Sequence, residues 1–189
     1  MRRRAFLGAA VTAALAGCTE SRSDPRGGTG SGTSLALSAA AFDDGGTIPP
    51  RYTCEGGDVN PELTISGVVN EAETLALVVD DPDAGDEPYV HWTLWNVPAS
   101  TETIPRSVAK REQPPFAEGA RQGVNSAGEV GYVGPCPPGG DDPHTYRVQL
   151  SAVSTTLDLA GGATRDELGD PLSGDVIDSV TLTGQYGRD

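Results

Sequence analysis

The residues of this 189-residue chain best suited to chemistry are its only two histidines, His91 and His144. His91 follows the acidic stretch DDPDAGDEPYV at 80–90, and His144 follows GYVGPCPPGGDDP at 131–143. A carboxylate beside a histidine fixes the imidazole tautomer and favours its protonated form, and an imidazole gains or loses a proton near neutral pH. Asp81 follows an apolar run closely, so its carboxylate is expected at a strand end. These residue types favour a small polar site over two hydrogen-bonded histidines on strand faces.

Other kinds of site fit these residues less well. A zinc site needs about four closely spaced ligands, which two histidines and scattered acids do not provide. A serine hydrolase needs a presented nucleophile, and the chain lacks a G-x-S-x-G elbow, although serine triads do not require one. The glycines of 28–32 lie in a polar segment and do not form a nucleotide-binding loop. We therefore expect no metal and no cofactor.

The elements that must position the histidines are β-strands. From residue 35 onward, apolar residues form short clusters separated by Gly, Pro, Asn and Asp. The run LALVV at 75–79 is typical of a central strand buried on both faces. Residues 90–97, 144–151 and 179–186 alternate in polarity, as strands with two distinct faces do.

Alternation also assigns the candidate residues to faces. In 144–151, His144 and Tyr146 share the inward face, where the strand emerges from a loop. In the strand before it, strict alternation places His91 on the face opposite Trp92. Polar tips at the rim of an apolar core are typical of a small pocket.

One helix is predicted over 164–173. Thr164 and Glu167 can form a capping box, and Asp170-Pro171 is expected to break or kink the helix early. Numerous strands with long irregular connections predict a mainly β fold, an antiparallel Greek-key β-sandwich with one or two short helices.

The N-terminus has the features of an export signal. Residues 1–17 combine three arginines with an apolar run too short to span a bilayer, which predicts a signal peptide. Arg2-Arg3 and the residues after it resemble a twin-arginine signal. Leu15-Ala16-Gly17-Cys18 resembles a lipobox, in which Cys18 is lipidated. The chain is thus expected to be exported and anchored to the outer face of the cell membrane.

The rest of the mature chain divides into two parts. Residues 18–33 contain no large apolar side chain, which predicts a flexible tether after the lipidated cysteine. Residues 34–189 form the predicted folded domain.

The chain is strongly acidic, with a net charge of −14 and one lysine. Such a charge excludes nucleic acid as a partner, because phosphate binding needs basic surfaces. Removing 1–17 takes away three arginines and no acids, so the mature charge is −17. We interpret the acid excess as the surface of a protein from a salt-loving organism; the alternative is an ordinary acidic secreted protein.

Several motifs, in this order, resemble those of the phosphatidylethanolamine-binding protein family. They are YTCEG from Tyr52, DDPDA from Asp80, VHW from Val90, GYVGPCPP from Gly131 and HTY from His144. The resemblance is to the bacterial and archaeal branch, described as Raf-kinase-inhibitor-like, and covers about 34–187.

The resemblance implies a β-sandwich with a small anion pocket and no enzymatic activity. Family members bind phosphate-like head groups, and several inhibit kinases or proteases by docking on them. Transferred residue by residue, the pocket consists of Asp81, His91, His144 and Tyr146, with Pro137 and Pro138 in its wall. Imidazole N–H and phenol O–H groups can donate to a phosphate oxygen. The expected partner is a small anion or phospholipid head group; alternatively, the chain is a protease or kinase inhibitor in which the pocket is secondary.

The chain also departs from the family pattern. Asp175 stands where the family often has a histidine, and Asp141-Asp142 add acid before His144, which repels an anion. The C-terminal helix of the animal members has no counterpart after Gly187, so their lipid and kinase functions are expected to transfer weakly.

Two cysteines remain once Cys18 is lipidated. In an oxidising compartment Cys54 and Cys136 form a disulfide or stay as two buried thiols, and the sequence leaves both alternatives open.

Overall fold

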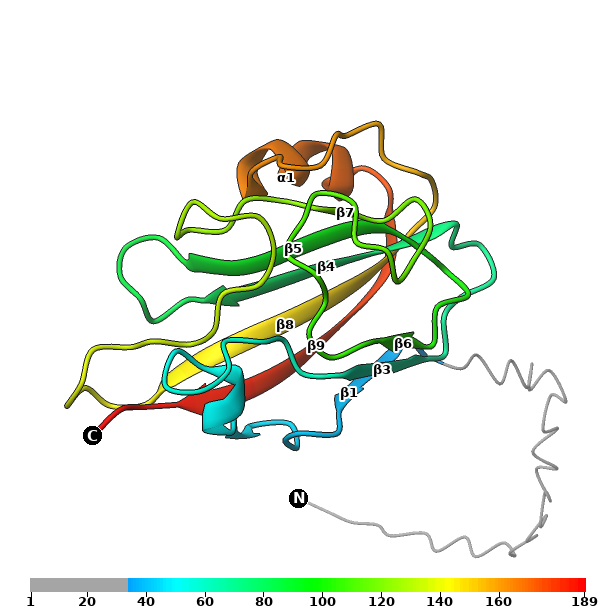
Figure 1. The fold of residues 1–189 in the computed structure, drawn as a ribbon. Coiled ribbons are helices and arrows are strands. Elements are labelled where there is room, and N and C mark those ends of the chain that lie inside the picture. The colour runs from blue at the N-terminus through cyan, green and yellow to red at the C-terminus, as the bar shows by residue number, and fades with distance from the viewer. Residues whose placement is uncertain (1–33) are drawn as a thin grey trace, which may run out of the picture. The chain divides into compact units, whose positions relative to one another are not determined.

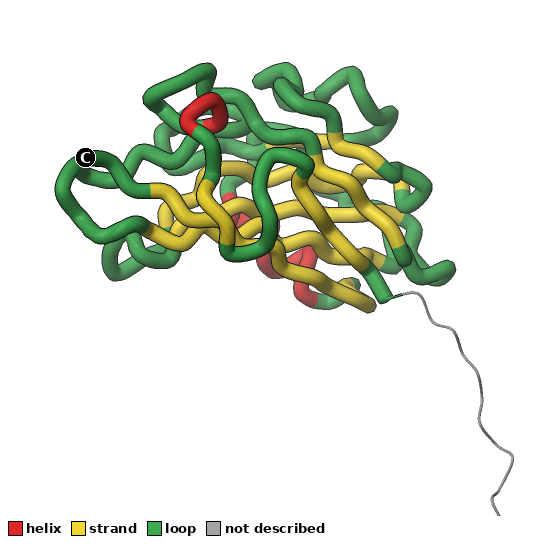
Figure 2. The backbone as a smooth tube through the Cα atoms, turned by 90° about the horizontal axis from the view of Figure 1, so that it is seen from below, coloured by secondary structure: helices red, strands yellow, loops and turns green. Residues whose placement is uncertain are grey.

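The computed structural model describes residues 34–189. The strands form a six-stranded sheet in the order β2-β9-β8-β4-β5-β7 and a three-stranded sheet in the order β1-β3-β6 (Figure 1). The predicted mainly β fold is confirmed, and Figure 2 shows that helix is confined to short segments. The predicted signal peptide, Cys18 and tether lie outside the described residues.

The elements have the following bounds. The strands are β1 Ala36–Ala39, β2 Gly46–Thr47, β3 Leu63–Ser66, β4 Thr74–Asp81, β5 Tyr89–Pro98, β6 Thr103–Ile104, β7 Arg121–Gln122, β8 His144–Val153 and β9 Val176–Tyr186. The helices are the 3-10 helix η1 Pro50–Tyr52 and the α-helix α1 Arg165–Ser173.

The large sheet contains a Greek key. Strands β4, β5 and β7 are successive antiparallel neighbours, and β8 returns by a long connection to pair antiparallel with β4 on its other side. The exception to antiparallel pairing is the two-residue β2, which runs parallel to β9. The key places the end of β4 beside the beginning of β8, where the candidate residues lie.

The middle of β4, residues 75–79, is apolar because both of its faces are covered. Leu75, Leu77 and Val79 belong to the main core, which includes residues of the three-stranded sheet. The alternate residues Ala76 and Val78 belong to a second core that includes α1. Figure 1 shows α1 and the small sheet on opposite sides of the large sheet.

Helix α1 begins at the predicted capping box. The Thr164 hydroxyl accepts a hydrogen bond from the amide of Glu167, whose carboxylate accepts one from the amide of Thr164. Pro171 does not break the helix early, because the helix continues to Ser173 with Leu168 and Leu172 buried. No helix within residues 34–189 is long and apolar enough to cross a membrane.

Candidate functional site

A pocket of about 580 Å³ opens where β4 ends and β8 begins, a size typical of small-molecule sites. Its lining residues come from β4, β5, β8 and the loops around them: Cys54, Asp58, Asp81, Asp83, Ala84, Gly85, Tyr89, His91, Val133, Gly134, Cys136, Pro137, Pro138, Asp141 and His144. The structure thus brings Asp81, His91, Pro137 and His144 together. The fifth predicted site residue, Tyr146, lies beneath the lining.

A β-bulge in β5 turns His91 toward the pocket. Consecutive β4 residues pair with Trp92 and Val90, so His91 between them has no partner in β4. The His91 ring packs edge-on against Tyr146, with ring centroids 5.2 Å apart, and Trp92 packs in the same core as Tyr146. The prediction from strict alternation, which placed His91 and Trp92 on opposite faces, is therefore wrong.

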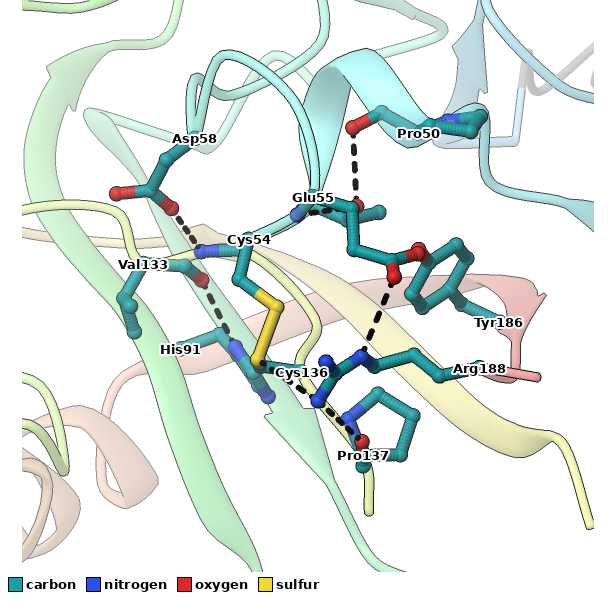
Figure 3. The surroundings of a disulfide bond; sticks show 12 residues. Pro50, Cys54, Glu55, Asp58, His91, Val133, Cys136, Pro137, Tyr186 and Arg188 are labelled. Carbon is teal, nitrogen blue, oxygen red and sulfur yellow. Dashed lines mark hydrogen bonds and ion pairs between the residues drawn. A yellow bond between two sulfur atoms is a disulfide. The ribbon is translucent and has the colours of Figure 1, made fainter. Parts of the chain in front are cut away.

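The Nδ1–H group of His91 is already used by the protein. Nδ1 lies 2.8 Å from the carbonyl oxygen of Val133, and a carbonyl can only accept, so Nδ1 carries the proton (Figure 3). Burial lowers the pKa of His91 below its usual range, although the Val133 hydrogen bond and the charge of Asp81 oppose this shift. A lowered pKa favours the uncharged ring at neutral pH, in which Nε2 has a lone pair rather than a proton. We expected an N–H group of His91 to donate to an anion, but the Nδ1–H group donates to the carbonyl of Val133 instead.

His144 is held by the carboxylate of Asp81. Nδ1 of His144 lies 2.8 Å from Oδ2 of Asp81, and both side chains are largely buried. The other oxygen of Asp81 accepts a hydrogen bond of 2.9 Å from the amide of Asp83. With both oxygens engaged, Asp81 is placed to orient His144 rather than to touch a ligand.

Tyr146 supports the two imidazoles from below. Its side chain is 1 % exposed, and its ring stacks on His144 with ring centroids 6.4 Å apart. Burial, and then the charge of Asp81, raise the pKa of Tyr146, so its hydroxyl stays protonated. Among residues 34–189 this hydroxyl has no hydrogen-bond partner.

One wall of the pocket is closed by a disulfide between Cys54 and Cys136, both of which are exposed. Beside it, the amide of Cys54 donates to the carbonyl of Pro135 at 3.1 Å. The amide of Gly134 donates to the carboxylate of Asp58 at 2.6 Å. The two loops that form this wall are therefore joined by a covalent bond and by hydrogen bonds (Figure 3).

The C-terminal segment secures the same wall. Arg188 donates to the carbonyl of Pro137 at 3.3 Å and forms an ion pair of 3.4 Å with Glu55. The Tyr186 hydroxyl donates to the other carboxylate oxygen of Glu55. The sequence analysis did not assign Glu55, Tyr186 and Arg188 to this wall, because their contacts join segments far apart in the chain. It also missed Asp58 and Tyr89 as lining residues.

The pocket is rich in hydrogen-bond acceptors. It is lined by four carboxylates, and among the described lining residues there is no lysine or arginine. Asp58 pairs with Lys110, which does not line the pocket, and Asp83 accepts from the amide of Thr145. Asp141 is exposed. The described lining also contains no serine, threonine or free thiol beside the Asp81–His144 pair.

Comparisons with known proteins agree with this architecture. Residues 38–187 match the family model described as phosphatidylethanolamine-binding protein. One similar protein is the UPF0098 protein of Pyrococcus abyssi, which is 40 % identical over 84 % of this chain and 89 % of its own length. Another is the UPF0098 protein of Methanothermobacter thermautotrophicus, which is 40 % identical over 80 % of this chain and 98 % of its own length.

Two solved structures are also similar. A phosphatidylethanolamine-binding protein homologue of Chlamydia trachomatis is 33 % identical, with a TM-score of 0.74 over 83 % of this chain and 99 % of its own. E. coli YbcL is described as a new member of the mammalian phosphatidylethanolamine-binding protein family. It is 30 % identical, with a TM-score of 0.76, and the match covers 82 % of this chain and 99 % of YbcL.

Proposed function

Because the chain belongs to the phosphatidylethanolamine-binding protein family, we propose that it is a non-enzymatic binding protein whose pocket takes a small phosphate-like anion, such as a phospholipid head group. Proteins of this family are generally non-catalytic and bind small ligands or partners. The observation that carries the proposal is the convergence of His91 and His144, from β5 and β8, on one pocket.

The pocket is organised before a ligand arrives. The imidazole of His91 is held by Val133 and that of His144 by Asp81, and the disulfide and Arg188 hold the wall that contains Cys136 and Pro137. A preorganised site loses little conformational entropy on binding. The surrounding carboxylates repel an anion, so we expect modest affinity, about millimolar, or roughly 4 kcal/mol.

The first prediction tests the pocket with inorganic phosphate and phosphoethanolamine, by titration calorimetry and chemical-shift mapping in about 1 M chloride. His144→Ala should abolish measurable binding, because losing a hydrogen bond to a charged ligand costs about 1.5–3 kcal/mol. Gln149→Ala is the matched control, since Gln149 lies on the same strand but on the exposed face.

Two results would contradict this proposal. One is equal binding by wild type and His144→Ala. The other is a set of ligand-induced shifts scattered away from Asp81, His91 and His144. Either would favour a protein-docking inhibitor in which the pocket is secondary.

We also propose that the chain is exported and anchored to the outer face of the membrane through a lipid on Cys18. The support is the order of Arg2-Arg3, the short apolar run and Cys18 in the sequence. As the second prediction, Cys18→Ser should move the expressed protein from the detergent phase to the aqueous phase in detergent partitioning. Cys54→Ser is the control and should stay in the detergent phase; unchanged partitioning of Cys18→Ser would refute the anchor.

A further inference from the structure

Both pocket histidines use the same ring nitrogen for contacts within the protein. Nδ1 of His91 donates to the Val133 carbonyl, and Nδ1 of His144 lies against the Asp81 carboxylate, each at 2.8 Å. The polar ring atom left for a ligand is therefore Nε2 in each case. Figure 3 shows the second ring nitrogen of His91 away from Val133.

The surroundings of His91 favour an uncharged ring. His91 is 3 % exposed, and burial disfavours the imidazolium more than the neighbouring carboxylates favour it. The ionisable groups that face it are Tyr89 from β5, Tyr146 from β8, Asp80 and Asp81 from β4, and Asp58 from the loop after η1. Among the described lining residues, no lysine or arginine compensates for the missing proton.

We propose that, among phosphate-like anions, the pocket selects the form that carries its own proton, with the P–O–H group donating to Nε2 of His91. The inference rests on the proposed function and names the ligand form that the site takes. An unprotonated phosphate oxygen facing Nε2 would place two lone pairs together and leave both atoms desolvated without a hydrogen bond. A protonated phosphate replaces that repulsion with an O–H···N hydrogen bond.

The pocket carboxylates act in the same direction. Asp58, Asp83 and Asp141 disfavour a dianion more than a monoanion, because repulsion increases with ligand charge. A simple pH titration therefore mixes the effect of ligand charge with the effect of the donor. A clean test requires two ligands of equal charge and similar shape, of which one has the donor.

Methyl phosphate and methyl sulfate meet this requirement at about pH 5.5, below the second pKa of a phosphate monoester, which is about 6. Both are then largely monoanions, but methyl sulfate has no O–H group. Titration of the full-length chain should show methyl phosphate binding at least about tenfold more tightly, the effect of one unsatisfied polar contact.

His91→Gln tests the residue that makes the distinction. A glutamine amide can present either its oxygen or its N–H group, so the preference for methyl phosphate should fall to within about threefold. Gln149→Ala, on the exposed face of β8, should keep the wild-type preference. Nitrogen-15 spectra of the histidine rings, recorded at the pH of the ester titration, should show Nε2 of His91 unprotonated in the free protein.

Three results would overturn the inference. Equal binding of both esters by the wild type would do so while leaving the proposed function intact. A wild-type preference that persists in folded His91→Gln would show that other groups discriminate. Binding of neither ester would remove the proposed function as well. If His91→Gln fails to fold, the inference is still tested by the ratio of the wild-type affinities for the two esters and by the nitrogen-15 spectra of the histidine rings.

Discussion

The carboxylate of Asp81 joins the loop after β4 to the start of β8. One of its oxygens lies 2.8 Å from Nδ1 of His144, and the other accepts a hydrogen bond from the amide of Asp83. Asp83 in turn accepts a hydrogen bond from the amide of Thr145. This bond also links the loop after β4 to the start of β8. These acids are structural groups of the pocket, whereas Asp141 lines it and is exposed to solvent. Asp141 is therefore the carboxylate whose charge can be removed with little effect on the architecture.

The third prediction concerns this charge. Asp141→Asn should raise the affinity for inorganic phosphate about twofold to fivefold in dilute buffer, because one repelling charge is lost. The gain should vanish in about 1 M salt, where screening is nearly complete. Titration calorimetry at both salt concentrations measures this change in affinity. Asp142→Asn is the matched control, since Asp142 does not line the pocket, and equal gains from both variants would contradict the assignment.

At the scale of elements, long-range links position the wall formed by the loop after η1 and the segment before β8. The Cys54–Cys136 bond joins residues 82 apart, connecting the loop after η1 to the segment before β8. Arg188, just after β9, holds the carbonyl of Pro137 in the same wall. Since both cysteines are exposed, the bond is open to reductants in solution.

The fourth prediction is that replacing Cys54 and Cys136 together by serine lowers the free energy of unfolding by about 4 kcal/mol, the chain-entropy value for a loop of this length. Urea denaturation with and without a dithiol reductant measures the change. The reductant should bring the wild type to the variant's stability and leave the variant unchanged. A variant as stable as the oxidised wild type would show that the bond contributes nothing.

At the scale of the whole molecule, negative charge dominates the surface. Residues 34–189 have a net charge of −17 and three ion pairs that involve lysine or arginine: Lys110–Asp58, Arg147–Asp80 and Arg188–Glu55. Most acids in this part of the chain therefore lack a basic partner. Their mutual repulsion opposes the compact state unless salt screens it.

The fifth prediction follows from this repulsion. The melting temperature should fall steadily as potassium chloride is lowered from about 1 M to about 0.01 M, where the Debye length grows from about 3 to about 30 Å. Sucrose stabilises by exclusion from the protein surface without screening charge, so it should not restore the loss fully. A melting temperature that stays level across this range would contradict the interpretation of a salt-adapted surface.

Local patterns in the sequence determined the fold class and the positions of the main strands. The apolar run at 75–79 and the alternation at 144–151 predict β4 and β8, because burial and side-chain period depend on neighbouring residues. Family motifs also pointed to Asp81, His91 and His144 as one group. Helix α1 was predicted from its capping box, although Pro171 proved compatible with its last turn.

Tertiary structure decided which ring atoms of His91 and His144 remain available to a ligand. The bulge that turns His91 inward depends on its register with β4, which alternation within one strand cannot reveal. The Val133 carbonyl that accepts the hydrogen bond from Nδ1 of His91 lies 42 residues along the chain, and the Cys54–Cys136 bond joins residues 82 apart. Such contacts form only when distant segments pack together. They convert a histidine expected to donate to an anion into one that presents an acceptor.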